Sequence, residues 1–258
     1  MWALFGRPCE AGVVRGEERV AAVYARATAA VPELATLIAP GTSALPGTVL
    51  TDAGWLADRL SDAARLWAVE NRRVIGTLWW YAASSTLLAP PVIASLVAGS
   101  TLDLAPAALT VWVRPDGYLG GGRTDRLLDD GSTHLGAAVR IHLGAIIRPL
   151  ATVSGATEPA LWAIATDSLS TWALRAGTAV GSVARGTGLA VAVARQALAM
   201  PAPRFVEVPG RGGAPRCYVR RCSCCLIYHL PGAELCISCP RQPPAERLRR
   251  LIAHARSD

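Results

Sequence analysis

The sequence predicts an α+β protein with a mainly helical body, a short β-sheet and a small C-terminal domain rich in cysteine. Apolar residues recur at helical spacing through much of the chain, and one segment near residue 110 alternates as a strand does. Six of the seven cysteines lie between Cys217 and Cys239. A proline-punctuated connector and a glycine-rich loop precede most of them, so we expect a body at 1–209 and a cysteine domain at 210–258.

The composition is that of a compact folded chain. Of 258 residues, 52% are hydrophobic and only 17% are charged, which excludes an extended disordered protein. The net charge is +7, and every basic residue is an arginine. A GC-rich genome explains the missing lysines without a functional cause, while a surface for anionic partners is the functional alternative.

Two features of the sequence bear on location. Cysteines confined to one short segment differ from the disulfide framework of a secreted domain. Residues 1–7 lack the basic region and the long apolar run of an export signal. We therefore expect a cytoplasmic protein, with a peripheral position at the inner face of the membrane as the alternative.

The first helices follow from apolar spacing and from capping residues. A helix is predicted over 16–31 and ended by Pro32, and a second helix is predicted after Thr51 with Asp52 as its cap. The uncharged run 74–102 is long enough to cross a membrane. Its polar and small residues favour a buried helix or helix pair instead, broken at its two adjacent prolines, Pro90 and Pro91.

The middle of the chain contains the strand signal. Residues 109–113 predict a strand, and 114–117 predict the turn that follows it. Three successive glycines at 120–122 predict a flexible loop, because no phosphate-binding pattern follows them.

Four helices are predicted in the second half of the chain, over 132–147, 158–176, 178–200 and 245–255. The second of these places Trp162 and Trp172 on one face. That stripe is expected to be core, and a wall for a bound ligand is the alternative. The last helix is basic and is expected to be solvated on one face.

Two ligand frames fit the C-terminal cysteines. Cys222 with Cys225 and Cys236 with Cys239 give a pattern like that of a zinc ribbon, with a short spacer. Cys224 and Cys225 with the same distal pair give C-C-x10-C-x2-C. Thiolates held so close together repel one another, and a metal centre neutralises them.

The adjacent cysteines favour the second frame. Neighbouring side chains in extended backbone point apart, so Cys224 and Cys225 do not suit a turn that aims two sulfurs at one ion. They reach two different irons of a [2Fe-2S] cluster more readily. A Rieske centre would need two histidines, and His229 is the only one in the segment. We expect His229 to be a neighbour of the site, with replacement of one cysteine ligand as the alternative.

The segment from Arg221 to Tyr228, continuing through Cys236 to Pro240, resembles the [2Fe-2S] domain that closes FhuF-type ferric-siderophore reductases. That family's signature is C-C-x10-C-x2-C. Fainter similarity extends upstream through 76–81, 88–92 and the region of Trp162. The resemblance implies that the cluster ligands are Cys224, Cys225, Cys236 and Cys239, with Cys222 left as an extra cysteine.

The resemblance also implies a function. The protein would be an oxidoreductase acting on metal ions, in which one electron from the cluster reduces Fe(III) in a hydroxamate or catecholate siderophore. Fe(II) would then be released into the cytosol. Residues 1–209 would be the substrate-binding body, and 210–258 the [2Fe-2S] domain. The chain lacks a dinucleotide fingerprint, so the implied electron donor is a partner such as a ferredoxin or a reductase.

Two other functions remain open on the sequence alone. A zinc-stabilised module would bind nucleic acid or protein, although the arginines are scattered and match no recognised nucleic-acid motif. A general iron-sulfur electron carrier would hold the cluster without a preference for ferric chelates. We expect neither nucleic-acid binding nor a transmembrane span.

Overall fold

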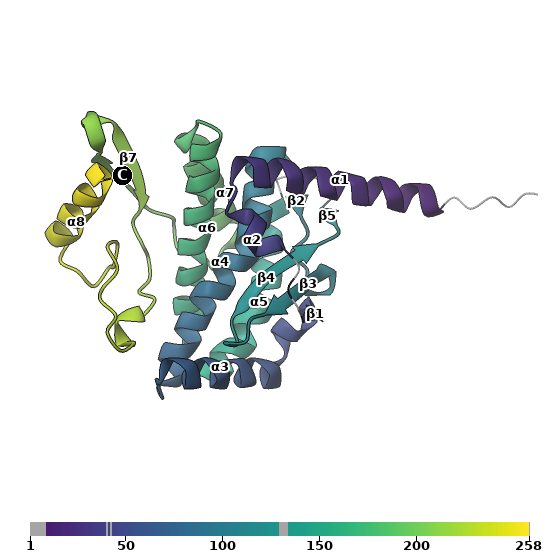
Figure 1. Cartoon of the computed structure of the whole chain (residues 1–258), viewed down its shortest axis with the longest axis horizontal. Helices are drawn as coiled ribbons and strands as arrows, with labels where there is room; N and C mark the ends of the chain where they lie inside the picture. The colour runs from purple at the N-terminus through teal and green to yellow at the C-terminus, as the bar shows by residue number, and fades with distance from the viewer. Residues whose placement is uncertain (1–8, 40, 42, 129–133, 258) are drawn as a thin grey trace, which may run out of the picture.

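The computed structural model describes residues 9–39, 41, 43–128 and 134–257, so the expectation about an export signal at 1–7 lies outside the described residues. Figure 1 shows a helical body with a smaller C-terminal part on one side of it. The body contains the helices α1 (Cys9–Ala30), α2 (Leu34–Ile38), α3 (Ala53–Trp67), α4 (Arg72–Ala98), α5 (Leu135–Ser154), α6 (Glu158–Ala179) and α7 (Val183–Ala197). Its strands are β1 (Ala44–Pro46), β2 (Thr101–Leu102), β3 (Leu109–Val113), β4 (Leu119–Thr124) and β5 (Leu127–Leu128). The predicted α+β class with a mainly helical body is confirmed.

Helix α4 is the central element of the body. It packs against α1, α3, α5 and α6, and most of its side chains are buried. The indole N–H of Trp79 donates to the Gly117 carbonyl at 3.0 Å, and that of Trp80 donates to the Leu161 carbonyl at 2.8 Å. Both buried tryptophans therefore satisfy their polar atom while they join α4 to the β3–β4 turn and to the start of α6.

The predicted break at Pro90 and Pro91 is wrong, because α4 continues as one helix to Ala98. Each proline removes an N–H donor, so the carbonyls of Thr86 and Leu87 lose their usual helical partners. Both prolines are buried against neighbouring elements, and this packing offsets the lost hydrogen bonds. By length and composition α4 could cross a membrane. However, 72% of an apolar 18-residue stretch of this helix is buried inside the protein. The expectation of a buried helix is confirmed.

A three-stranded antiparallel sheet in the order β1-β3-β4 covers one side of the helices. The predicted strand and the turn after it are confirmed, and Gly117 closes that turn at φ 81°. The predicted glycine loop is wrong, because Gly121 and its neighbours form β4 and pair with β3. A Cβ atom on Gly121 would lie 2.4 Å from both the Trp112 ring nitrogen and the Leu37 carbonyl. Glycine is needed there for close packing, not for flexibility.

The second half of the body follows the helical periodicity. Helix α5 continues beyond the expected end at 147, to Ser154, and the first residues of its predicted range, 132–133, lie outside the described residues. Helix α6 begins at Glu158 as predicted. Its tryptophans, Trp162 and Trp172, are each 6% exposed and belong to the main core, so the core interpretation of the aromatic stripe is confirmed.

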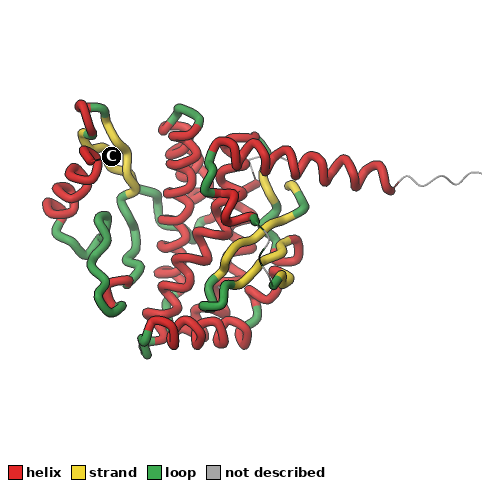
Figure 2. Tube along the Cα trace, viewed as in Figure 1, coloured by secondary structure: helices red, strands yellow, loops and turns green. Residues whose placement is uncertain are grey.

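The C-terminal part contains the hairpin β6 (Phe205–Pro209) and β7 (Pro215–Val219) and the helix α8 (Pro244–Ser257). Helix α8 packs on the hairpin through Leu251 and Ala255, which contact Val208. Figure 2 shows that most of the chain between β7 and α8 is loop. The division at 209/210 stays a prediction, and it falls between the two paired strands of this hairpin.

Two glycines of α7 provide a test of the packing between α6 and α7. A Cβ atom on Gly186 would lie 2.2 Å from the Ala173 carbonyl oxygen, which belongs to the α6 backbone and cannot easily move. Gly186→Ala should therefore lower the free energy of unfolding by about 1–3 kcal/mol, the usual cost of overpacking. Urea denaturation followed by far-UV circular dichroism measures this change.

Gly188→Ala is the matched control, because Gly188 lies on the same helix with nothing within 4 Å of its added Cβ. Alanine is the better helix former, so this variant should be more stable by up to about 1 kcal/mol. Equal effects of the two substitutions would contradict the close approach of α6 and α7.

Candidate metal centre

The cysteine segment folds as two short turns that face each other. Cys224 and Cys225 are followed by Leu226, whose left-handed backbone (φ 62°) reverses the chain into the 3-10 turn η5 (Ile227–His229). The backbone N–H groups of Leu226 and Ile227 hydrogen-bond the sulfurs of Cys224 and Cys225, respectively. Cys236 and Cys239 lie on a second turn, closed by a 3.0 Å hydrogen bond from the Cys239 N–H to the Cys236 carbonyl.

The four sulfurs of these cysteines form two pairs. The sulfurs of Cys224 and Cys239 lie 3.8 Å apart. The sulfurs of Cys225 and Cys236 hydrogen-bond each other, and both accept from Arg221 Nη1, at 3.5 and 3.6 Å. Two thiolates bound tetrahedrally to one metal ion at about 2.3 Å lie about 3.8 Å apart. The adjacent cysteines therefore belong to different pairs, as two irons would require.

Arg221 supplies the positive charge of the site. Burial alone would lower its pKa, but Cys225, Tyr81 and Asp167 together raise it, so the guanidinium stays charged. The hydrogen bond with Cys236 lowers the pKa of Cys225 to about 5; burial opposes this shift and Arg221 adds to it. The same hydrogen bond raises the pKa of Cys236, so the two sulfurs share one proton. A metal ion would displace that proton.

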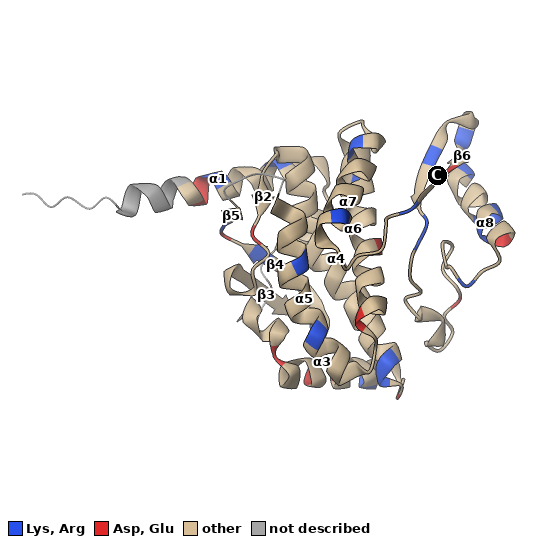
Figure 3. Ribbon diagram, turned by 180° about the vertical axis from the view of Figure 1, so that it is seen from behind, with Lys and Arg blue, Asp and Glu red and all other residues tan. Residues whose placement is uncertain are grey.

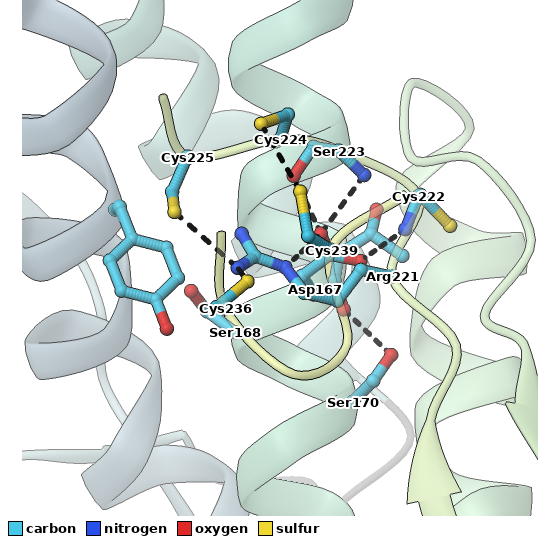
Figure 4. Close-up of polar contacts among 12 residues, drawn as sticks. Asp167, Ser168, Ser170, Arg221, Cys222, Ser223, Cys224, Cys225, Cys236 and Cys239 are labelled. Atoms are coloured by element: carbon cyan, nitrogen blue, oxygen red, sulfur yellow. Dashed lines mark hydrogen bonds and ion pairs between the residues drawn. The ribbon is translucent and has the colours of Figure 1, made fainter. Parts of the chain in front are cut away.

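Asp167, on α6, holds the first turn in place (Figure 4). Its carboxylate accepts from the backbone N–H groups of Cys222 and Ser223, at 2.7 and 3.0 Å. It also accepts from the Ser223 hydroxyl at 2.5 Å and from Arg221 Nε at 3.3 Å. The Asp167 side chain is 4% exposed, so these four donors compensate its burial.

Cys222, Cys217 and His229 lie outside the two sulfur pairs. Cys222 donates through its sulfur to the Ala202 carbonyl at 3.6 Å, and Figure 4 shows this sulfur directed away from the other four. Cys217 lies on β7. His229 is exposed and stacks on Tyr228, with ring centroids 4.4 Å apart. The geometry thus favours the C-C-x10-C-x2-C frame over the frame that begins at Cys222, and the ligand set is proposed on that basis.

A cleft of about 680 Å³ lies beside the site. Helix α6, the middle of α4 and the end of α1 with the turn after it form one wall, and β7, α8 and the turn at Cys236 form the other. Its polar lining residues include Glu33, Tyr81, Arg175, Arg216, Arg221 and His254. Glu33 pairs with Arg175 at 3.3 Å and Asp167 pairs with Arg221, so Arg216 adds a further positive charge. Cys236 and Arg221 thus connect the candidate centre to an open, positively charged space.

The site segment matches a known domain. Residues 221–241 match the family model described as the FhuF 2Fe-2S C-terminal domain, and this range contains all four proposed ligands. This segment is similar to the FhuF [2Fe-2S] domain. The resemblance expected for this segment is confirmed, and the cofactor that it indicates is a [2Fe-2S] cluster. The fainter similarity upstream stays an expectation. No curated protein matches the chain.

The residues of this segment fit such a cluster. Two sulfur pairs provide two thiolates for each iron, and the backbone N–H groups of Leu226 and Ile227 already point at sulfur. Arg221 Nη2 is buried and has no hydrogen-bond partner in the described structure. The sulfides of a cluster would give it an acceptor, and an unpaired buried donor is otherwise costly.

Sequence reasoning did not identify Asp167. The signal available was a single carboxylate in the otherwise uncharged stretch between Glu158 and Arg175, on a helix that is largely buried. A buried carboxylate needs donors, and here the cysteine turn provides them.

Purified protein should be red-brown and should contain about two irons and two acid-labile sulfides per chain. Metal analysis by mass spectrometry, with colorimetric sulfide determination, measures both quantities after anaerobic purification. A colourless protein with one zinc per chain that resists cluster reconstitution would contradict the assignment.

Single serine substitutions separate the two ligand frames. Cys224→Ser should lose the cluster, because Cys224 is paired with Cys239, whereas Cys222→Ser should retain it. Cys217→Ser is the matched control, since it removes a half-buried thiol outside both frames. Visible absorption per chain measures retention. Loss in Cys222→Ser with retention in Cys224→Ser would transfer the assignment to the other frame.

Proposed function

We propose that the protein reduces Fe(III) held by a siderophore and releases Fe(II). The observation that supports this function is the cleft of about 680 Å³ whose wall includes the candidate ligand Cys236. Its volume falls within the range of small-molecule sites, about 300–1,000 Å³. A bare electron carrier needs no such space, whereas a reductase must hold its acceptor close to the cluster.

The side chains around the cleft suit a bulky iron chelate. Arg175, Arg216 and His254 offer hydrogen bonds and positive charge to oxygen-rich or anionic groups. Apolar contacts come from Leu174 and Ile237 on opposite walls. The arginines are distributed over the body and the C-terminal part, as Figure 3 shows, so a continuous nucleic-acid surface is not what they suggest.

The chemistry of release follows from ligand hardness. Hydroxamate and catecholate oxygens bind hard Fe(III) far better than Fe(II), so one electron weakens the chelate enough to free the metal. A bound [2Fe-2S] cluster would supply that single electron, and a donor protein would restore it. The role of the chain is to hold the chelate in the cleft, next to Cys236. This reaction makes the protein an oxidoreductase acting on metal ions.

The proposed function also includes an electron donor and a cellular location. We expect a ferredoxin or a reductase to supply the electron, since a cluster exchanges one electron at a time. A cytoplasmic location agrees with the release of Fe(II) for use inside the cell.

The proposed function predicts saturable electron transfer. Cluster reduced with dithionite should be oxidised by a ferric hydroxamate or catecholate siderophore at a rate that reaches a plateau with concentration. Stopped-flow absorption in the visible region follows the cluster, and an added Fe(II) chelator reports the product. Rates that rise linearly and equally for siderophores and for ferric citrate would indicate a general electron carrier instead.

A pair of threonines makes this test specific to the cleft. Thr171 lines the cleft and Thr152 lies on α5; both are exposed, and both donate their hydroxyl to the carbonyl four residues earlier. Thr171→Trp should raise the half-saturating siderophore concentration by at least about tenfold through steric exclusion, whereas Thr152→Trp should leave it unchanged. A change in both variants, or in neither, would contradict binding in the cleft.

A further inference from the structure

We infer that Arg221 sets the reduction potential of the cluster and directs the added electron to the side held by Cys225 and Cys236. This inference depends on the proposed ligand set and not on the identity of the acceptor. It assigns Arg221 a positioning role, because its contacts are with ligand sulfurs.

The positive charge of Arg221 is buried next to two candidate ligand sulfurs. The Arg221 side chain is 8% exposed, and its Nη1 donates to the sulfurs of Cys225 and Cys236, at 3.5 and 3.6 Å. An added electron makes a cluster more negative, and hydrogen bonds and positive charge near the sulfurs favour that state. The effect is large in a buried site, where water screens the charge only weakly.

Among the described contacts, Arg221 donates to the sulfurs of one pair only, Cys225 and Cys236. Cys224 accepts from the backbone N–H of Leu226, which is neutral. Arg247 approaches Cys239, but it donates to the backbone carbonyl at 3.5 Å and not to the sulfur. The two irons would therefore differ in electrostatic surroundings, and the iron held by Cys225 and Cys236 is the better position for the extra electron.

Arg221 is held in place from two further directions. Its Nε donates to Asp167 at 3.3 Å, and its guanidinium lies over the Tyr81 ring, 4.9 Å from the centroid. The negative charge of Asp167 opposes the effect of Arg221. However, three other donors share that carboxylate, and the guanidinium itself contacts the sulfurs. The positive charge therefore dominates at the cluster.

The sulfur pair that contacts Arg221 also faces the cleft, through Cys236. Cys225 and Cys239 are buried, and Cys224 and Cys236 are both half-buried, but of these four cysteines it is Cys236 that lines the cleft. The sulfur pair that contacts Arg221 is thus the pair that reaches the open space. Electron transfer slows steeply with distance, so placing the electron on this side serves an acceptor bound in the cleft.

The first experiment is a redox titration of holoprotein variants, monitored by visible absorption. In Arg221→Met the ratio of oxidised to reduced cluster at a fixed potential should rise at least about tenfold. This corresponds to a reduction potential lower by about 59 mV for one electron. Arg221→Gln should give a shift in the same direction, and Arg221→Lys, which keeps the charge, should recover part of it.

Arg220→Met is the matched control, because Arg220 is the exposed neighbour of Arg221 and carries the same charge. Its effect should be small and should disappear in 1 M salt, with a Debye length of about 3 Å, whereas the shift in Arg221→Met should persist. A potential unchanged in Arg221→Met with full cluster content would overturn the inference. Loss of the cluster in all three Arg221 variants would also overturn it, by showing a role in assembly.

The second experiment uses the unmodified protein and tests which iron is reduced. Proton NMR of the dithionite-reduced protein, with cysteine β-protons assigned by selective labelling, distinguishes ferric from ferrous ligands by the temperature dependence of their shifts. The ferrous signature should belong to Cys225 and Cys236, and its appearance on Cys224 and Cys239 would disprove the placement. Neither experiment contains a siderophore, so a failure of the proposed reductase activity would be detected separately.

Discussion

The structure depends above all on one buried carboxylate. Asp167 projects from the middle of a core helix and accepts from two backbone N–H groups, a hydroxyl and a guanidinium of the cysteine turn. Removing one partner of such a buried pair typically costs about 3–5 kcal/mol, whereas replacing both by apolar residues is often harmless. Stability alone therefore does not explain why the pair is there. The arrangement makes sense because it fixes Arg221 against the sulfurs of two candidate ligands, Cys225 and Cys236.

Much of the fold could be predicted from local rules, because those rules act over a few residues. The strand at 109–113, the Asp52 cap and the start of α6 at Glu158 follow from alternation, capping and periodicity. The errors arose where tertiary packing overrides local preference. Two prolines remain inside α4 because the surrounding core compensates their lost hydrogen bonds. A glycine run that reads as a flexible loop is a strand, since Trp112 and the α2 backbone leave no room for a Cβ.

The candidate site, too, has features that could be predicted from the sequence and features that could not. The cofactor was predictable, because the cysteine segment resembles the FhuF [2Fe-2S] domain. The choice of Cys224, Cys225, Cys236 and Cys239 as ligands stays a prediction, since spacing along the chain left two frames open. The pairing of Cys224 with Cys239 and of Cys225 with Cys236 depends on how the two turns face each other in three dimensions, which the sequence does not reveal. Asp167 and the cleft were not predictable, because they arise from contacts between segments more than fifty residues apart in the sequence. Sequence separation of that size leaves no periodic or spacing signal to detect.

The cysteine segment is attached to the body a second time, through Leu230. This side chain packs against Val74 and Leu78 on α4, while Asp167 holds the other end of the segment from α6. A loop fixed at both ends to rigid helices changes shape very little when the charge of its metal centre changes. The energy needed to rearrange the surroundings during electron transfer is correspondingly low, since the dipoles are already oriented. The large helical body would therefore act as a rigid frame for a bound cluster and would lower the energy barrier to its loss of an electron.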